Sequence, residues 1–241
     1  MRRPARRPRG AAADEAVHAA LTDAILKGRL PAGTRLPEQR LAAIFRVSRE
    51  RMRKVLHRLA AERRIEIVEN QGARVPRPTP EEIRSIYEAH RLLEAGILVD
   101  LAGRIDPATV DRLEAQLDEE EQAAHRGDRA ASVRLSGAFH LGLADALGNA
   151  ELSRFLRDLL SRSSVMVSLY EPAAQSICAV DEHRAILAAL KAGDGPRAAA
   201  LSREHFAHVE ERLRLGRDEA PAPVLEAIFS GDAVSPRSAF D

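Results

Sequence analysis

The 241-residue sequence contains no tryptophan, and its aromatic residues amount to only 3% of the chain. Alanine and leucine dominate instead, and this composition favours packed helices over sheets. The single cysteine, Cys178, excludes an intramolecular disulfide framework and fits a reducing cytosol. No apolar run approaches the roughly 18 residues of a membrane span, and the N-terminus has no apolar signal core. We therefore expect a cytoplasmic, mainly α protein with no membrane partner.

Charge is distributed unevenly, although the whole chain carries a formal net charge of only +1. Residues 1–77 contain 19 Lys and Arg against 8 Asp and Glu, whereas the remainder contains 18 against 28. A basic first third followed by an acidic remainder is typical of a polyanion-binding domain joined to a domain with another task. The length of the chain leaves room for both domains.

The segment Val47–Leu59 (VSRERMRKVLHRL) combines an apolar stripe with a dense set of cations. Ser48 is a favoured N-cap residue, so we expect a helix to begin there. Such a helix is able to dock on a small core and insert its N-terminal end into a DNA major groove. Taken alone, the segment is equally compatible with an ordinary solvated basic helix. The stripe consists of Met52, Val55, Leu56 and Leu59, which recur at helical spacing.

The segments around this helix predict a winged helix-turn-helix domain over residues 13–76. Gly28 is expected to stop a helix, Pro37 suits a first helical turn, and Asn70-Gln71-Gly72 is typical of a hairpin turn. A disordered basic arm at residues 1–12 is expected before it. The expected elements are helices at 14–27, 37–45 and 48–59 and a hairpin of strands at 65–68 and 73–75.

Several short motifs occur in a fixed order along this region. They are Ile25–Gly33 (ILKGRLPAG), Leu36-Pro37-Glu38, Leu41-Ala42, Val47-Ser48-Arg49, Arg53 and Asn70-Gln71-Gly72. Together they resemble the GntR family of bacterial transcription regulators. Glu50-Arg51 replaces the family's usual Thr-Pro, and Arg46 replaces its common turn glycine, where a left-handed backbone would cost about 1 kcal/mol. These departures concern base preference and leave the expected fold unchanged.

The resemblance implies a homodimer whose two winged domains bind the halves of a palindromic double-stranded DNA operator. Cations, hydroxyls and backbone amides at the start of the recognition helix would hold phosphates, and arginines on the same helix would contact guanine edges. The wing tip would approach the minor groove. The predicted DNA-contacting residues are Ser48, Arg51 and Lys54 at phosphates, Arg49 and Arg53 at guanines, and Gln71 and Gly72 at the wing tip.

Residues 81–215 are typical of an all-α helical bundle with few strand signals. A proline-rich linker at residues 77–80 precedes it, since alternating prolines stiffen the chain and exclude helix. Residues 216–241 are expected to form a mobile tail with a short helical turn at 224–229. The six expected helices lie near 80–104, 107–126, 129–147, 150–169, 177–192 and 195–215, separated by glycine and proline positions.

Three histidines of this bundle, His140, His183 and His205, each fall on the apolar stripe of a separate helix. A single histidine on such a stripe is more often a satisfied core residue than a ligand. Three that face inward from separate helices of one domain indicate a shared site. Imidazole is the commonest metal ligand, and three of them leave a coordination position open.

Further motifs place these histidines in a family context. They are Phe139-His140, Gly148-Asn149, Glu182–Ile186, Gly193-Asp194 and His205–Val209, and they resemble the all-helical FCD effector domain of the FadR-type branch. The resemblance implies a divalent metal, such as zinc or nickel, held by His140, His183 and His205. The Asp that many members carry one turn before the first histidine is Ser136 here, so the metal would be held more weakly or completed by water or effector. The alternative is a polar cavity without metal, as other members of the branch have.

The same resemblance implies a small carboxylate effector in this cavity. Arg91, on the first helix of the domain, is the candidate residue for its anionic group. Ser136 and Arg134 are further candidates. The alternative for Arg91 is an ion pair with Glu88 or Glu94 on its own helix.

The sequence therefore predicts a dimeric, metabolite-responsive transcription regulator, most simply a repressor, and not an enzyme. The principal alternative is a His-coordinated metalloenzyme. Against it, the chain has no His-Glu-x-x-His motif and no pair of Glu-x-x-His motifs of the di-iron type. A third possibility is a constitutive DNA-binding protein whose helical domain senses nothing.

Overall fold

The computed structural model describes residues 9–171, 178–213 and 223–229. The chain divides into two compact units, Met1–Arg77 together with Glu219–Asp241, and Pro78–Asp218. We call the first the winged unit and the second the helical unit. No described helix is long and apolar enough to cross a membrane.

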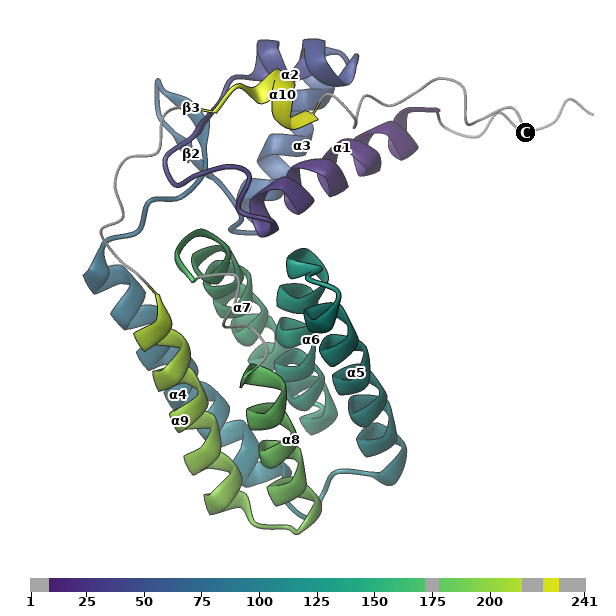
Figure 1. The fold of residues 1–241 in the computed structure, drawn as a ribbon, viewed down its shortest axis with the longest axis vertical. Coiled ribbons are helices and arrows are strands. Elements are labelled where there is room, and N and C mark those ends of the chain that lie inside the picture. The colour runs from purple at the N-terminus through teal and green to yellow at the C-terminus, as the bar shows by residue number, and fades with distance from the viewer. Residues whose placement is uncertain (1–8, 172–177, 214–222, 230–241) are drawn as a thin grey trace, which may run out of the picture. The chain divides into compact units, whose positions relative to one another are not determined.

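The winged unit is built around α3, which packs against both α1 and α2 (Figure 1). The predicted stripe of α3 is buried, and its cations lie on the remaining faces. Burying such a side chain contributes about 1.5–3 kcal/mol, so this stripe fixes α3 on the small core. The elements are α1 (Arg9–Leu26), β1 (Arg35–Leu36), α2 (Glu38–Phe45), α3 (Arg49–Ala61), β2 (Glu66–Val68), β3 (Gly72–Arg74) and α10 (Leu225–Phe229).

The turn between α2 and α3 confirms two local predictions. Arg46 has the left-handed backbone that its place in the motif indicated, with φ 53° and ψ 40°, and its N–H bonds back to α2. Ser48 caps α3, because its Oγ accepts a hydrogen bond from the backbone N–H of Arg51 at 3.3 Å. The cap satisfies one of the orphan donors at the helix start.

The wing is a three-stranded antiparallel sheet in the order β1-β3-β2. The predicted hairpin is confirmed as β2 and β3, and its turn uses positive φ at Asn70 and Gly72. β1 was not predicted, because two residues are too short to produce a periodic pattern. It pairs Arg35 with Arg74 and Leu36 with Ala73.

Two predictions about the chain ends need correction. α1 begins at Arg9, inside the segment 1–12 that was expected to be a disordered arm; residues 1–8 lie outside the described residues. Part of the expected mobile tail, residues 216–241, is the helix α10, which matches the predicted turn at 224–229 but packs on the winged unit. The rest of that tail lies outside the described residues.

α10 completes the core of the winged unit. Phe229 is fully buried, and its ring centroid lies 4.9 Å from that of Phe45 on α2. Arg29 donates a hydrogen bond to the carbonyl of Ile228 at 3.0 Å, and Arg40 on α2 pairs with Glu226. The sequence pattern did not reveal this docking, because a five-residue helix carries too few apolar positions to identify its partner.

Within its described residues, 78–171 and 178–213, the helical unit has six helices, as predicted. Figure 1 shows them as one bundle. α4 packs along α9, α5 lies against α6, and α8 lies against α9. Side-chain caps begin most of them, including a capping box between Thr79 and Glu82 at the start of α4. The helices are α4 (Pro80–Leu101), α5 (Pro107–His125), α6 (Arg129–Leu147), α7 (Ala150–Tyr170), α8 (Cys178–Lys191) and α9 (Gly195–Arg212).

The interior of the helical unit is apolar around a polar centre. One cluster of buried side chains joins α4, α5, α6, α8 and α9, and two smaller clusters involve α4 with α7. Among these apolar clusters the bundle buries His90, Glu94, Glu120, His140, His183 and His205. Buried polar groups of this kind are costly unless they pair with one another, so their arrangement defines the candidate site.

Candidate DNA interface and histidine cavity

The exposed face of α3 carries the two arginines predicted to contact guanine. Arg49 and Arg53 are 65% and 53% exposed, and both donate to the carboxylate of Glu38 at the start of α2. Arg53 contacts both carboxylate oxygens, at 3.0 and 3.2 Å. Glu38 therefore holds the two guanidinium groups side by side, and hydrogen bonding from Arg53 is the main cause that lowers the pKa of this carboxyl.

The other predicted DNA contacts are less uniform in their surroundings. Lys54 is exposed, and Ser48 lies at the N-terminal end of α3. Gln71 and Gly72 are exposed at the wing tip. Arg51, in contrast, turns toward α1, where it donates to the carbonyl of Gly10 at 2.8 Å. A phosphate contact by Arg51 would have to replace that bond.

The helical unit brings His140 of α6, His183 of α8 and His205 of α9 together. Their candidate ligand atoms all lie within 4.8 Å of one another, and each side chain is at most 2% exposed. The ring centroids are 4.7 to 5.1 Å apart. The prediction that three helices direct these histidines to one place is therefore confirmed.

Each of these histidines shares a hydrogen bond with a different glutamate through its Nδ1 atom. His140 donates to Glu94 of α4 at 2.7 Å, and His205 donates to Glu182 of α8 at 2.7 Å. The contact between His183 and Glu120 of α5 is 3.2 Å. Because Nδ1 is engaged in each ring, Nε2 remains as the donor toward a ligand. This carboxylate–histidine arrangement is the usual support of a metal-binding imidazole.

Burial keeps two of the imidazoles neutral. It lowers the pKa of His205 to about 3 and that of His183 well below its ordinary value. Burial by itself would raise the pKa of Glu94, but the net shift is downward, and the largest opposing influence is the neighbouring His140, which also donates a hydrogen bond to this carboxylate. Burial raises the pKa of Glu120 to about 7. Neutral imidazole is the form that binds metal, so His183 and His205 need no deprotonation first.

The residues present fit a divalent metal. The candidate ligand atoms of His140, His183 and His205 lie within 4.8 Å of one another, so these three residues would hold one ion between them. Nε2 of His183 is buried and has no hydrogen-bond partner among the described residues. A buried donor atom of this kind is costly unless something binds it, and an ion between the imidazoles would satisfy it.

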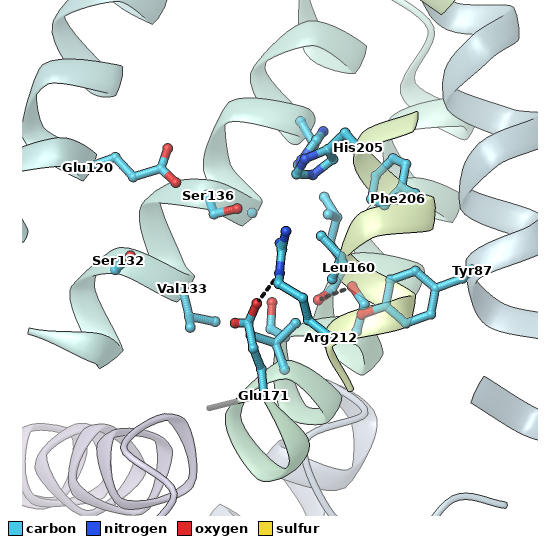
Figure 2. Close-up of a pocket in the computed structure, with 16 residues that line it drawn as sticks. Tyr87, Glu120, Ser132, Val133, Ser136, Leu160, Glu171, His205, Phe206 and Arg212 are labelled. Carbon is cyan, nitrogen blue, oxygen red and sulfur yellow. Dashed lines mark hydrogen bonds and ion pairs between the residues drawn. The ribbon is translucent and has the colours of Figure 1, made fainter. Parts of the chain in front are cut away.

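A cavity of about 60 Å³ adjoins the histidines. Its volume accommodates about four water-sized groups, and its lining includes Ser136, Tyr87, Glu120 and Arg212. In Figure 2, the side chain of Arg212 extends from α9 toward the middle of the cavity, between Glu171 and His205. Its Nε donates to Glu171 at 2.8 Å, and the side chain is 16% exposed. The hydroxyl of Tyr87 is buried and has no partner within the described part of the chain.

Ser136 is the only one of the three predicted effector residues that lines this cavity. Arg91 instead donates to Glu210 of α9 at 2.6 Å, which is neither the predicted effector contact nor the alternative pair with Glu88 or Glu94. Arg134 is exposed and lies outside the cavity lining. Arg91 and Arg134 are both absent from the cavity lining, which includes Arg212, so Arg212 is the arginine placed to meet an anion there.

The supporting glutamates and Arg212 were missed by sequence reasoning, although two of them leave a signal. Glu94 and Glu120 fall on otherwise apolar stripes of α4 and α5, and a carboxylate in such a place must be paired. Glu182 stands directly before His183, but adjacency on a helix does not indicate that it meets His205. Arg212 ends a helix among many exposed charges, so no pattern distinguishes it.

Comparisons with known proteins match both units. The model of the bacterial regulatory proteins of the gntR family matches residues 13–75, and the FCD domain model matches residues 85–208. The HTH-type transcriptional regulator LutR of Bacillus subtilis is 27% identical over 211 residues, covering 78% of this chain and 95% of LutR. A probable D-xylose utilization operon repressor of Paenarthrobacter nicotinovorans is 27% identical over 170 residues, covering 70% of this chain and 75% of the repressor.

Solved structures share the fold. A GntR transcriptional regulator from Rhodococcus sp. RHA1 has a TM-score of 0.71 at 24% identity and covers 86% of this chain and all of its own. McbR/YncC of E. coli has a TM-score of 0.67 at 21% identity, covering 81% of this chain and 94% of its own. The curated relatives are transcription regulators, and the family model of the N-terminal unit is that of bacterial regulatory proteins, which favours the predicted regulator over the metalloenzyme alternative. The chain belongs to the GntR family of bacterial transcription regulators and carries an FCD domain behind its winged helix-turn-helix.

Proposed function

We propose that this regulator binds a divalent metal between its three imidazoles and senses a small carboxylate in the adjoining cavity. The ligand state then controls how a homodimer holds a palindromic operator in the cytoplasm. The observation that supports the proposal is the pairing of each buried histidine with its own glutamate. This leaves three Nε2 donors for one ion.

The metal is held by His140, His183 and His205, and zinc and nickel suit an all-imidazole set. When bound, the ion supplies a positive charge and an open position for a carboxylate oxygen. Isothermal titration of the metal-free protein with zinc or nickel tests this part. One ion per chain is expected for the wild type and none for His183→Ala, whereas His208→Ala, which removes an exposed histidine, keeps the site. Equal binding by all three proteins would contradict the assignment.

Ser136 offers a variant that should tighten the site. It lines the cavity at the position where the family pattern has an aspartate. Ser136→Asp places a carboxylate there, and we expect metal affinity to rise by about tenfold or more. A fall in metal affinity would mean that residue 136 does not lie where its carboxylate could bind the ion.

DNA recognition is assigned to the exposed end of α3. Arg49 and Arg53 contact guanine edges, Ser48, Arg51 and Lys54 hold phosphates, and the wing tip at Gln71 and Gly72 approaches the minor groove. The measurement is footprinting of the promoter-region duplex with Arg49→Ala. Loss of the protected site with an unchanged dimer mass supports the assignment, and an unchanged footprint contradicts it.

The effector's anionic group is assigned to Arg212 together with Ser136. Arg212 is the arginine that lines the cavity. Tyr87 adds a buried hydroxyl that has no hydrogen-bond partner among the described residues. A cavity of about 60 Å³ suits a ligand of a few heavy atoms, such as a short carboxylate. The experiment is a thermal-shift panel of short mono- and dicarboxylates on the metal-loaded protein. Arg212→Gln should abolish the shift, and the matched exposed variant Arg134→Gln should retain it.

A further inference from the structure

A second hollow, of about 230 Å³, lies in the winged unit beside the wing. It is lined by Gly33, Arg35, Gln71, Gly72, Arg74 and Arg77, which we call the arginine niche. The lining contains three arginines and no acidic residue. None of these arginines belongs to the recognition helix or to the DNA contacts assigned above, and the histidine cavity lies in the other unit. The niche shares only the wing-tip residues Gln71 and Gly72 with the DNA interface.

Strand register places two of the arginines directly opposite each other. Arg35 of β1 is the partner of Arg74 on β3, so both side chains leave the same face of the sheet. Like charges in directly opposed positions destabilise a sheet by a few tenths of a kcal/mol to about 1 kcal/mol. Glu66 of β2 pairs with Arg74 at 2.9 Å, whereas Arg35 makes no ion pair with any described residue. The arrangement therefore favours an external anion next to Arg35.

The third arginine, Arg77, lies close to the backbone of Gly33. Gly33 has φ +78°, and a Cβ at this position would lie 3.2 Å from Nε of Arg77. Both the backbone conformation and the close approach therefore suit glycine, and the guanidinium of Arg77 lies over its backbone. Guanidinium groups in a shared hollow match the oxygens of a phosphate better than a single point charge does.

We propose that the arginine niche binds backbone phosphate of the DNA duplex next to the minor groove that the wing tip enters. The location supports this, because Gln71 and Gly72 of the wing tip are part of the niche lining. The inference rests on the proposed DNA-binding role of the wing and assigns to the niche a sequence-independent contact. Phosphate contacts of this kind fix register and add salt dependence without reading bases.

The test is a salt titration of the full chain on its promoter-region duplex and on a scrambled duplex. Each phosphate contact contributes about 0.9 to the slope of log K against log salt. Arg35→Gln should reduce this slope by about one. It should also lower the affinity for both duplexes by the same factor, near tenfold at about 0.1 M salt. The triple change of Arg35, Arg74 and Arg77 to Gln should also reduce the slope by about one, since the three side chains share one phosphate. Lys27→Gln, an exposed cation of the same unit paired with Asp23, is the matched control and should leave the slope unchanged.

Thermal melting of the free protein adds a readout that a purely structural arginine would not give. Because Arg35 opposes Arg74, Arg35→Gln should raise the melting temperature of the winged unit by about 1–3 °C at low salt while it weakens DNA binding. A clear fall in melting temperature would mean that Arg35 supports the fold, and it would overturn the proposal.

The remaining outcomes separate the niche from the wider function. If the wild type binds duplex and the triple variant has the same salt slope, the niche assignment fails alone. If the wild type binds neither duplex at low salt, the niche and the proposed DNA recognition fail together. The last experiment uses inorganic phosphate. The DNA assignment is overturned if phosphate raises the melting temperature of the wild type but not of the triple variant, while both proteins have the same salt slope for DNA binding. In that case the niche binds free phosphate.

Discussion

The winged and helical units use charged side chains in opposite ways. On α3, Arg49 and Arg53 are more than half exposed and share the carboxylate of Glu38. In the helical unit, Glu94 and Glu120 are at most 1% exposed and meet buried imidazoles. Exposed ion pairs contribute little and are screened by salt, so the α3 arginines can exchange Glu38 for DNA at low cost. Buried pairs tolerate no such exchange, and they hold the cavity in one geometry.

Removing a buried carboxylate gives the largest expected effect and tests the contrast directly. Glu94→Ala leaves Nδ1 of His140 and the hydroxyl of Ser202 without their acceptor, which should lower the free energy of unfolding by about 3–5 kcal/mol. Glu38→Ala, the exposed counterpart, should change it by less than about 1 kcal/mol. Urea unfolding followed by circular dichroism measures both. Similar losses for the two variants would remove the distinction between the units.

A substitution in the C-terminal helix α10 tests whether this helix completes the core of the winged unit. Phe229→Ala removes the ring that packs on Phe45 and should destabilise the winged unit by about 1.5–3 kcal/mol. Hydrogen exchange should then be faster in α2 and unchanged in α6. Val224→Ala, a change at an exposed apolar residue of the same segment, is the control. Equal protection of α2 in the wild type and Phe229→Ala would show that α10 does not dock in solution.

A substitution on the recognition helix α3 should change DNA affinity without changing protein stability, unlike a substitution of the buried Glu94. Arg49→Ala should lose about 1–3 kcal/mol of discrimination between operator and scrambled duplex, with an unchanged melting temperature. Competition anisotropy with the two duplexes measures the discrimination. If both duplexes weaken by the same factor, Arg49 contacts phosphate and not a base edge.

A smaller effect concerns acid sensitivity of the helical unit. Burial lowers the pKa of His90 to about 4, below the ordinary value of 6.5, so the folded state keeps this ring neutral. Between about pH 6.5 and pH 4 the unfolded chain protonates His90 and the folded chain does not. Acid therefore favours unfolding in this window: the folded state keeps its full stability above about pH 6.5 and loses stability as the pH falls toward 4. His90 should contribute a slope of about 1.4 kcal/mol per pH unit in that window. His90→Gln should flatten the pH dependence of urea midpoints, and His125→Gln, at an exposed position, should not. An identical pH profile for His90→Gln would contradict the buried neutral ring.

Most of the fold could be predicted from local patterns. The apolar stripes and the glycine and proline positions placed the six helices of the helical unit, and Ser48 and Arg46 marked the turn before α3. β1 and the docking of α10 could not be predicted, because two strand residues or five helical residues carry too little periodicity. Their positions depend on tertiary partners far away in the sequence, Arg74 and Phe45.

The candidate site was predictable in its ligands and not in its surroundings. Inward-facing stripes placed the three histidines, since helical spacing specifies the face of a residue. Which carboxylate meets which imidazole depends on how α4, α5 and α8 are rotated about their axes, and no local pattern contains that. The same limit explains why Arg91 and Arg134 were chosen over Arg212, which enters the cavity from the last turn of α9.

The most direct test of the central claim is whether the histidine site governs DNA binding. Operator affinity should be measured by anisotropy for the wild type and His183→Ala, each with nickel and with chelator. We predict that the two conditions differ by at least about fivefold for the wild type, the lower end of ordinary allosteric coupling, and not at all for the variant. The same affinity for the wild type with metal and with chelator would contradict a metal-dependent regulator.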